Sequence, residues 1–358
     1  MSPIHVPIQV RACAAAVLAL ALTSCTLVGA DDERTGSTAP GETEVVLVTH
    51  ESFALPEKLL RRFESDTGLT LDVRSSGDAG TVTNKLVLTK DDPTGDVAFG
   101  VDNTFASRAL DAGVFADSGV DLPAGAEGFG LDDGTDRLVP VDTGSVCVNV
   151  DTGWFAERNL TPPSSLDDLV DPAYRDLFVT PGAATSSPGL AFLLSTIAEY
   201  GDAWPDYWAD LMANGAKLTS GWSDAYYVDF TQGGGEGDRP IVLSYDSSPA
   251  FTPTEDGSAS TTEALLDTCF RQVEYAGVLE GAANPEGARA VLEFLLSPEV
   301  QAALPESMYV FPVVDGVELP ADWGRFAVQP DDPYVVDSAD ITAQREEWLT
   351  TWTDVTSR

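Results

Sequence analysis

The sequence predicts an α/β protein built from two lobes. Strand and helix patterns alternate from residue 44 onward, which favours a mostly parallel sheet with helices on its faces. The chain has 358 residues, 43% of them hydrophobic, so it is long enough to bury two cores. A second set of strand and helix patterns follows the first. Loops at the carboxyl ends of the strands would then face one another across a cleft that suits a small ligand.

The first set of elements reads β-α-β-α-β. Val45 to Val48 is continuously apolar, as expected for a strand covered on both faces. The next helix starts at Pro56, continues to Thr67 and is stopped by Gly68. The other elements expected here are strands over 69–73 and 97–101 and helices over 81–90 and 107–113.

The second set repeats the same alternation. Its clearest member is the strongly apolar helix over 189–200, GLAFLLSTIAEY. The C-terminal helix over 341–353 carries Trp348 and Trp352 four residues apart, a spacing typical of packing on one face. The remaining expected elements are strands over 139–150, 177–180, 241–245 and 271–279, and helices over 204–212, 285–296 and 298–304.

The N-terminus has the pattern of an export signal. Arg11 precedes an apolar run that is too short to span a bilayer permanently, and Leu22-Thr23-Ser24 then leads to Cys25. This pattern resembles a bacterial lipoprotein signal, with residues 1–24 removed and Cys25 lipidated; the alternative is an ordinary secretory signal. The polar residues that follow, up to 43, are typical of a flexible tether.

Charge and histidine content exclude several functions. Asp and Glu number 58 against 19 Lys and Arg, and this net charge of −39 disfavours nucleic acids and anionic membrane surfaces while favouring a cationic partner. The charge can equally be a solubility or salt adaptation. Only His5 and His50 are present, and His5 lies in the leader, so zinc sites rich in His and Ser-His-Asp or Cys-His catalysis are disfavoured.

Two cysteines remain once Cys13 has left with the leader and Cys25 carries lipid. Cys147 and Cys269 both lie in runs that read as strands. In an oxidising compartment they can form a disulfide or stay as two buried thiols, and the sequence leaves both open.

Six segments carry a family resemblance. In chain order they are THESFALPEKLLRRFESDTGLTLDV, DVAFGVDNTFASRALDAGVF, ATSSPGLAFLL, GWSDAY, VLSYDSSPAF and NPEGARAVLEFLLSPEVQAALPESMYVFPV. Together they resemble the thiamine-binding subunits of bacterial thiamine ABC transporters, within the type II solute-binding proteins that also include ferric-ion binders. The resemblance runs from residue 44 to the C-terminus. It implies the two-lobed type II periplasmic-binding-protein fold, no enzymatic activity, no cofactor, and capture of thiamine or its phosphates for an ABC permease.

The resemblance also implies the ligand-binding residues. Thiamine carries a flat aminopyrimidine and a thiazolium cation, which aromatic faces and a nearby carboxylate suit best. The implied aromatic residues are Trp222, Tyr245, Tyr309 and Phe251, with His50 beside them. Three of these depart from the family pattern, in which Tyr is expected at 50 and 251 and Trp at 309.

The implied carboxylates are Asp78, Asp102 and Asp142, each at or near a strand end. An Asp in such a place can equally be a turn or helix cap. Ser186 and Ser187 precede the apolar helix, so a phosphate or hydroxyl of the ligand could bind at this helix N-terminus, although the same residues can simply cap it.

Three alternatives stay open. Tyr226 and Tyr227 could ligate ferric iron with His50 and a carboxylate, as in an iron-binding relative. A thiamine- or pyrimidine-processing hydrolase would need an activated nucleophile, and the sequence has no Gly-x-Ser-x-Gly motif or Cys with a His partner. A ligand-free scaffold or sensor lipoprotein would bind no small molecule tightly.

The predicted organisation follows from these elements. Lobe 1 is expected to comprise residues 44–145 and 270–315, and lobe 2 residues 146–269 and 316–358. We expect a monomer outside the cytoplasm, held to the outer face of the cytoplasmic membrane by its lipid alone.

Overall fold

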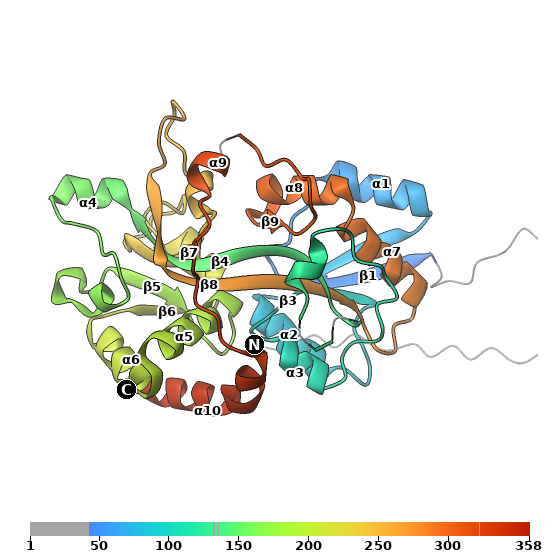
Figure 1. Ribbon diagram of the computed structural model, residues 1–358, viewed down its shortest axis with the longest axis horizontal. Helices are drawn as coiled ribbons and strands as arrows, with labels where there is room; N and C mark the ends of the chain where they lie inside the picture. Colours follow the sequence, from blue (N-terminus) through green and yellow to red (C-terminus); the bar gives the residue numbers. More distant parts are fainter. Residues whose placement is uncertain (1–42, 132, 135, 322) are drawn as a thin grey trace, which may run out of the picture. The chain divides into compact units, whose positions relative to one another are not determined.

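The computed structural model describes residues 43–358 apart from 132, 135 and 322, and its strands form one mixed sheet (Figure 1). The sheet order is β2-β1-β3-β8-β4-β7-β5-β6, with β9 paired to β4. The strands are β1 (Glu44–Thr49), β2 (Thr70–Ser75), β3 (Val97–Asp102), β4 (Val139–Asp151), β5 (Phe178–Pro181), β6 (Lys217–Thr219), β7 (Ile241–Tyr245), β8 (Thr262–Val278) and β9 (Phe311–Pro312).

Helices cover both faces of this sheet. The α-helices are α1 (Glu57–Thr67), α2 (Ala79–Leu88), α3 (Ala106–Asp111), α4 (Thr152–Arg158), α5 (Ser187–Tyr200), α6 (Trp204–Ala213), α7 (Pro285–Leu295), α8 (Pro298–Met308), α9 (Trp323–Phe326) and α10 (Ser338–Thr356). Shorter turns of helix are η1 (Ala126–Phe129), η2 (Asp167–Val170), η3 (Pro172–Tyr174), η4 (Gly201–Ala203), η5 (Asp224–Asp229) and η6 (Ser248–Phe251). Within the described part of the chain, none of the helices has the length and apolar character needed to cross a bilayer.

The predicted parallel pairing is confirmed for the first strands and is incomplete for the whole sheet. β1 pairs in parallel with β2 and β3, and β5 pairs in parallel with β6 and β7. The long strands β4 and β8 run antiparallel to each other and to their outer neighbours β7 and β3. The predicted strand over 271–279 is the second half of β8, which begins earlier, at Thr262.

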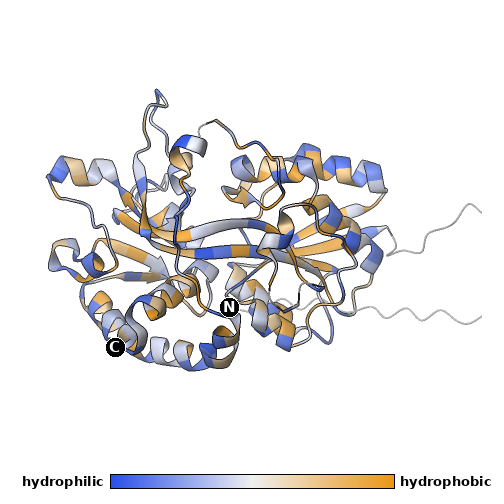
Figure 2. Ribbon diagram, viewed as in Figure 1, coloured by the Kyte–Doolittle hydropathy of each residue, from blue (hydrophilic) through white to orange (hydrophobic). Residues whose placement is uncertain are grey.

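Burial follows from this layering. α7 packs against β1, β3 and β8, and α2 packs against β1 and β3 from the other face (Figure 1). All six residues of β3 are therefore buried, as expected for a strand covered on both faces. Hydrophobic residues concentrate on the strands and on the inner sides of the helices, while the outer helix faces are hydrophilic (Figure 2). Leu59 and Phe63 of α1 belong to the core beside β1.

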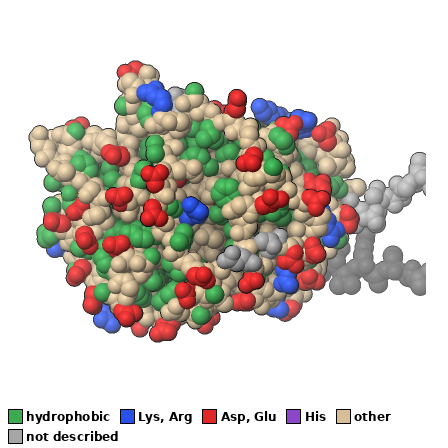
Figure 3. Space-filling model, in the orientation of Figure 1, with side chains coloured by type: hydrophobic (Ala, Val, Ile, Leu, Met, Phe, Trp, Pro, Cys, Tyr) green, Lys and Arg blue, Asp and Glu red, His purple; other side chains and the backbone are tan. Residues whose placement is uncertain are grey.

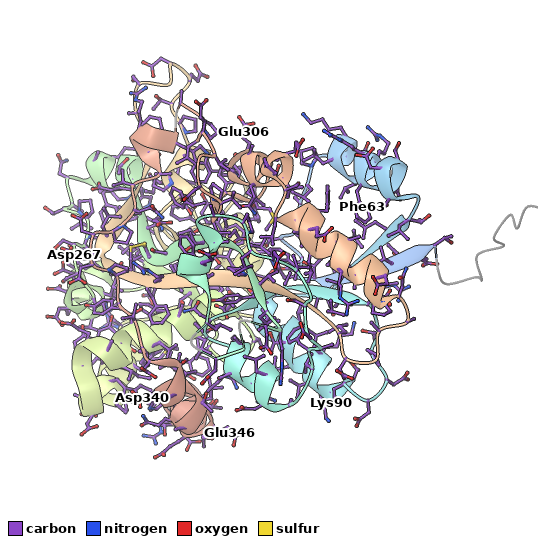
Figure 4. All side chains as sticks on the ribbon, turned by 45° about the vertical axis from the view of Figure 1, so that its right-hand side comes forward. Phe63, Lys90, Asp267, Glu306, Asp340 and Glu346 are labelled. Carbon is purple, nitrogen blue, oxygen red and sulfur yellow. A yellow bond between two sulfur atoms is a disulfide. The ribbon has the colours of Figure 1, made fainter. Side chains whose placement is uncertain are left out.

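A disulfide joins the two long strands. Cys147 of β4 and Cys269 of β8 are bonded, and their Cα atoms lie 4.2 Å apart (Figure 4). The register of the β4–β8 ladder shifts between Val146 and Val148, so Cys147 lies at a bulge. The thiol alternative therefore does not apply to this structure.

The predicted leader, the lipidated Cys25 and most of the tether fall within residues 1–42, outside the described residues. The proposed lobe boundaries stay a prediction.

Candidate ligand-binding site

A cavity of about 420 Å³ lies where several loops converge, in the size range of roughly 300–1,000 Å³ that is typical of small-molecule sites. Its walls come from the loop after β1, the start of α2, the start of α5, η5 with the turn before it, the end of β7 with η6, the middle of β8 and the end of α8. Most of the predicted ligand-binding residues line it, namely His50, Asp78, Ser187, Trp222, Tyr245, Phe251 and Tyr309. The structure therefore brings together residues from six separate parts of the sequence.

Trp222 is held firmly at the centre of an aromatic group. Its indole Nε1 donates to Ser244 Oγ at 3.0 Å, and its backbone N–H donates to Asp78 Oδ2 at 3.0 Å. The indole stacks on Tyr226 with a centroid separation of 5.0 Å and meets Tyr245 edge-on at 6.1 Å. Because Trp222 is fixed at both its backbone and its ring nitrogen, its side chain is already oriented before a ligand arrives.

Two consecutive tyrosines reach the cavity from a π-helix. The segment Asp224–Asp229 forms η5, a rare helix type that is frequently found at functional sites. Tyr226 is buried and Tyr227 is about half exposed, and their rings lie nearly perpendicular at 5.4 Å. The sequence places both residues in the alternative iron site, but their neighbours here are Trp222 and Phe251.

Tyr309 closes the aromatic wall from the end of α8. It ends the helix as its C-cap in a left-handed backbone conformation with φ of 57°, which is unfavourable for a residue that is not glycine. Its carbonyl accepts a hydrogen bond from Ser247 Oγ, which helps to hold that conformation. Phe251 meets the Tyr309 ring edge-on at 4.8 Å.

Asp78 cross-links three parts of the site. It is the N-cap residue of α2, yet its side chain makes no cap hydrogen bond there. Its carboxylate accepts instead from Ser186 Oγ at 2.9 Å, from the Ser187 N–H at 3.0 Å and from the Trp222 N–H at 3.0 Å. Burial raises the pKa of Asp78 above its usual value, and these three bonds act against that effect. The carboxylate thus fills the positive N-terminus of α5, where the sequence suggested a ligand phosphate.

Ser186 and Asp102 do not line the cavity and lie directly behind it. Ser186 is the N-cap of α5 and accepts from the Gly189 N–H. Asp102 is fully buried at the end of β3, where it accepts hydrogen bonds from the hydroxyls of Ser187 and Thr104. Burial raises the pKa of Asp102 to about 7. These residues position Ser187, which does reach the cavity.

Glu274 is the main cavity residue that the sequence did not single out. It lies on β8, is only 7% exposed, and lines the cavity together with Gln272. Asp142, which does not line the cavity, lies opposite Glu274 in the β4–β8 ladder. Burial and the charge of Glu274 raise the pKa of Asp142 well above its usual value. The signal for Glu274 in the sequence is the pair Gln272 and Glu274, two polar residues at alternate positions of the buried strand RQVEYAGV.

His50 faces Glu274 from the loop after β1. Its Nε2 lies 3.4 Å from Glu274 Oε1, and its Nδ1 accepts from the Ser52 N–H at 3.2 Å. Burial acts to lower the pKa of His50, but the charge of Glu274, its hydrogen bond to the imidazole and the charges of Asp78 and Glu51 together raise the pKa above the ordinary value. The ring fits because residue 100 is a glycine with φ of 94°, at which a Cβ would come within 2.1 Å of the imidazole.

The cavity is electronegative and has no strongly basic side chain. Its lining includes the carboxylates of Glu51, Asp78 and Glu274, and among the described lining residues there is no Lys or Arg. Acidic side chains are also widely scattered over the face shown in Figure 3, with few basic ones between them. A flat cation matches this combination of aromatic rings and carboxylates better than an anion does.

The surroundings of Tyr226 and Tyr227 favour the protonated phenols. Burial raises the pKa of both Tyr226 and Tyr227, whereas a phenolate ligand must lose its proton. Among the residues that the structure describes, no group of three or more His, Cys, Asp or Glu side chains is arranged to hold a metal ion.

Comparison with known proteins agrees with this class of site. The model of the bacterial extracellular solute-binding protein family matches residues 92–335, and the chain belongs to this family. Two relatives are named thiamine-binding periplasmic protein. The one from Escherichia coli (strain K12) is 32% identical over 330 residues, covering 90% of this chain and 96% of its own. The one from Brucella melitensis is 30% identical over 329 residues, covering 89% and 94%.

Solved structures show the same fold. A periplasmic thiamin binding protein has a TM-score of 0.77 at 30% identity, covering 88% of this chain and 96% of its own. Iron-bound HitA from Pseudomonas aeruginosa has a TM-score of 0.67 at 19% identity, covering 87% and 99%, which supports the fold alone. The predicted two-lobed type II periplasmic-binding-protein fold is therefore confirmed.

Proposed function

We propose that this solute-binding protein captures thiamine outside the cytoplasm and passes it to the permease of an ABC transporter. The observation that carries the proposal is the cavity itself, where Trp222, Tyr245 and Tyr309 stand beside carboxylates without a Lys or Arg. The thiamine-binding relatives, which align over about nine-tenths of the chain, support the same ligand.

The chemistry is capture without reaction. Aromatic faces attract a delocalised cation by about 0.5–2 kcal/mol each, depending on how far the contact is desolvated. Two such aromatic faces come from different elements: Trp222 lies in the turn before η5, and Tyr309 lies at the end of α8. Closure of the cleft around the ligand would desolvate these contacts, and the permease would then reopen it.

The cellular setting completes the proposal. The family is extracellular, which agrees with an N-terminal leader. Cys25 would carry the lipid that holds a monomeric receptor to the outer face of the cytoplasmic membrane, with the following polar residues as its tether. A net charge of −39 would raise the capture rate of a cation at low salt.

Tryptophan fluorescence of the purified chain tests the proposal. Thiamine should quench the emission at sub-micromolar concentration, and Trp222→Ala should weaken binding at least about tenfold, or about 1.4 kcal/mol. Trp154→Ala is the matched control, because Trp154 lies on α4, outside the cavity, and should leave the affinity unchanged. No response to thiamine, with a coloured complex on adding ferric citrate, would refute the proposal and favour Tyr226 and Tyr227 as iron ligands.

A further inference from the structure

The carboxylates around the cavity differ in how many hydrogen bonds they accept from the protein. Asp78 accepts three hydrogen bonds at the N-terminus of α5, and Asp102 accepts hydrogen bonds from Ser187 and Thr104. Glu51 lines the cavity but is exposed, so water screens its charge. Glu274 is the buried lining carboxylate with no backbone N–H or hydroxyl donor in the described part of the chain, and its polar neighbours are the His50 imidazole at 3.4 Å and the Asp142 carboxyl.

Glu274 is also the middle member of a buried row of acids. Asp102 of β3 and Asp142 of β4 lie directly opposite it in the two neighbouring ladders, so all three side chains share one face of the sheet. Their exposed fractions are 0% for Asp102, 7% for Glu274 and 1% for Asp142. Like charges placed opposite each other across strands destabilise a sheet. Burial and this crowding raise the pKa of Asp102 and of Asp142, and a cation beside Glu274 would relieve the crowding.

The protein supplies little positive charge of its own here. His50 is the basic residue of the cavity lining, and its Nδ1 accepts a hydrogen bond from the Ser52 N–H. An imidazole that accepts at Nδ1 carries its single proton on Nε2 and is neutral. In this arrangement the neutral ring presents only an N–H toward Glu274, and it gains a full charge only when the pH falls.

A second polar group on the same strand points to a ligand. Gln272 is 2% exposed and lines the cavity two residues before Glu274, hence on the same face of β8. Its Nε2 donates to Ser187 Oγ at 3.0 Å, which fixes the amide, while its Oε1 has no hydrogen-bond partner among the described residues. A buried acceptor left without a partner is costly unless a ligand or water donates to it.

We propose that Glu274 is the counter-ion of the ligand's positive charge and the residue that makes the cavity select a cation. The proposal rests on the proposed thiamine function and names the part of the site that recognises the charge. Asp78 and Asp102, which the sequence suggested for this role, instead hold the loops and α5 in position. Gln272 Oε1 lies beside Glu274 as an acceptor for an N–H of the same ligand.

Titration calorimetry with two ligands tests the assignment. The ligands are thiamine and its neutral isostere, in which carbon replaces the positively charged thiazolium nitrogen. The unmodified protein should bind thiamine at least tenfold more tightly than the isostere. Glu274→Gln keeps the shape of the side chain and removes its charge. The substitution should weaken thiamine binding at least tenfold and change the affinity for the isostere by no more than about threefold.

Glu263→Gln is the matched control, because Glu263 lies exposed at the start of the same strand, outside the cavity. It makes the same change in net charge and should leave both affinities unchanged. The assignment would be overturned if Glu274→Gln lost affinity for thiamine and for the isostere equally. It would also be overturned if the unmodified protein bound both ligands equally well. The comparison of the two ligands on the unmodified protein needs no variant, so it does not depend on whether Glu274→Gln folds. Failure of the unmodified protein to bind thiamine at all would instead refute the proposed function.

Discussion

Removal of the disulfide between Cys147 and Cys269 should destabilise the protein by about 5 kcal/mol. The bond joins residues separated by 122 positions in the sequence. A cross-link of that span lowers the entropy of the unfolded chain by roughly 16 cal/mol/K, or about 4.9 kcal/mol at 25 °C. Both cysteines are fully buried, so replacement by alanine also removes packed sulfur atoms and adds to the loss.

The position of the disulfide extends the effect to the ligand site. Cys147 lies opposite Ser244 in the β4–β7 ladder, and Ser244 Oγ accepts the hydrogen bond from the Trp222 indole. Loosening β4 at its bulge therefore disturbs the strand that fixes Trp222. We expect the double variant Cys147→Ala/Cys269→Ala to bind thiamine more weakly as well as to unfold at a lower temperature.

Scanning calorimetry measures the main effect. For about 300 ordered residues the unfolding entropy is roughly 0.6 kcal/mol/K, so a loss of about 5 kcal/mol lowers the midpoint by about 8 °C. A reductant should lower the midpoint of the unmodified protein similarly and leave that of the double variant unchanged. A midpoint shift below about 2 °C, with thiol titration showing the unmodified protein oxidised, would refute the reasoning.

Three further predictions concern charge. Thiamine diphosphate should bind at least about tenfold more weakly than thiamine in a competition titration, because Asp78 already fills the N-terminus of α5; equal affinity would contradict this. The thermal midpoint should be higher at pH 5.5 than at pH 8, because burial raises the pKa of Asp102 and Asp246 to about 7 and the folded chain then binds protons that the unfolded chain releases. Asp246→Asn should narrow that difference, and an unchanged difference would exclude Asp246 as a cause. Thiamine affinity should fall as the pH drops from 8 to 6, because Glu274, Asp78 and Glu51 together overcome the effect of burial and raise the pKa of His50. The protonated ring then competes with the ligand for Glu274. His50→Gln should flatten this dependence, and a titration curve of the same slope in that variant would argue against the competition.

Local patterns predicted most of the secondary structure. The helix that starts after Pro56 and stops at Gly68 is present as expected, with Gly68 in the left-handed conformation. The strand Ile241–Tyr245 has the predicted bounds. The first half of β8 was missed, because TEALLD lacks a clean alternation and the ladder shifts register just beyond it. Pairing direction in the centre of the sheet depends on contacts between distant residues, which local patterns do not encode.

The candidate ligand-binding residues came from the family resemblance, and their role in binding stays a prediction. Trp222 and Tyr245, two of the aromatic residues that the resemblance implied, line the cavity. Asp78 was predicted with the right location, but the three donors that occupy its carboxylate come from residues more than a hundred positions away. Glu274 was missed because its importance arises from the neighbouring strands that place Asp102 and Asp142 opposite it.

The opposite pH trends expected for stability and affinity have one physical origin. Burying Asp102 and Asp142 beside Glu274 opposes folding when all three are ionised, so protonation stabilises the fold. Protonation also removes the negative potential that attracts a cation. A row of neutral side chains would make the folded protein more stable. A bound cation would offset the cost of burying three acids beside a cavity whose described lining has no Lys or Arg. Glu274→Gln should accordingly unfold at an equal or higher temperature than the unmodified protein at pH 8 while binding thiamine less tightly, a combination that a purely structural role for Glu274 does not produce.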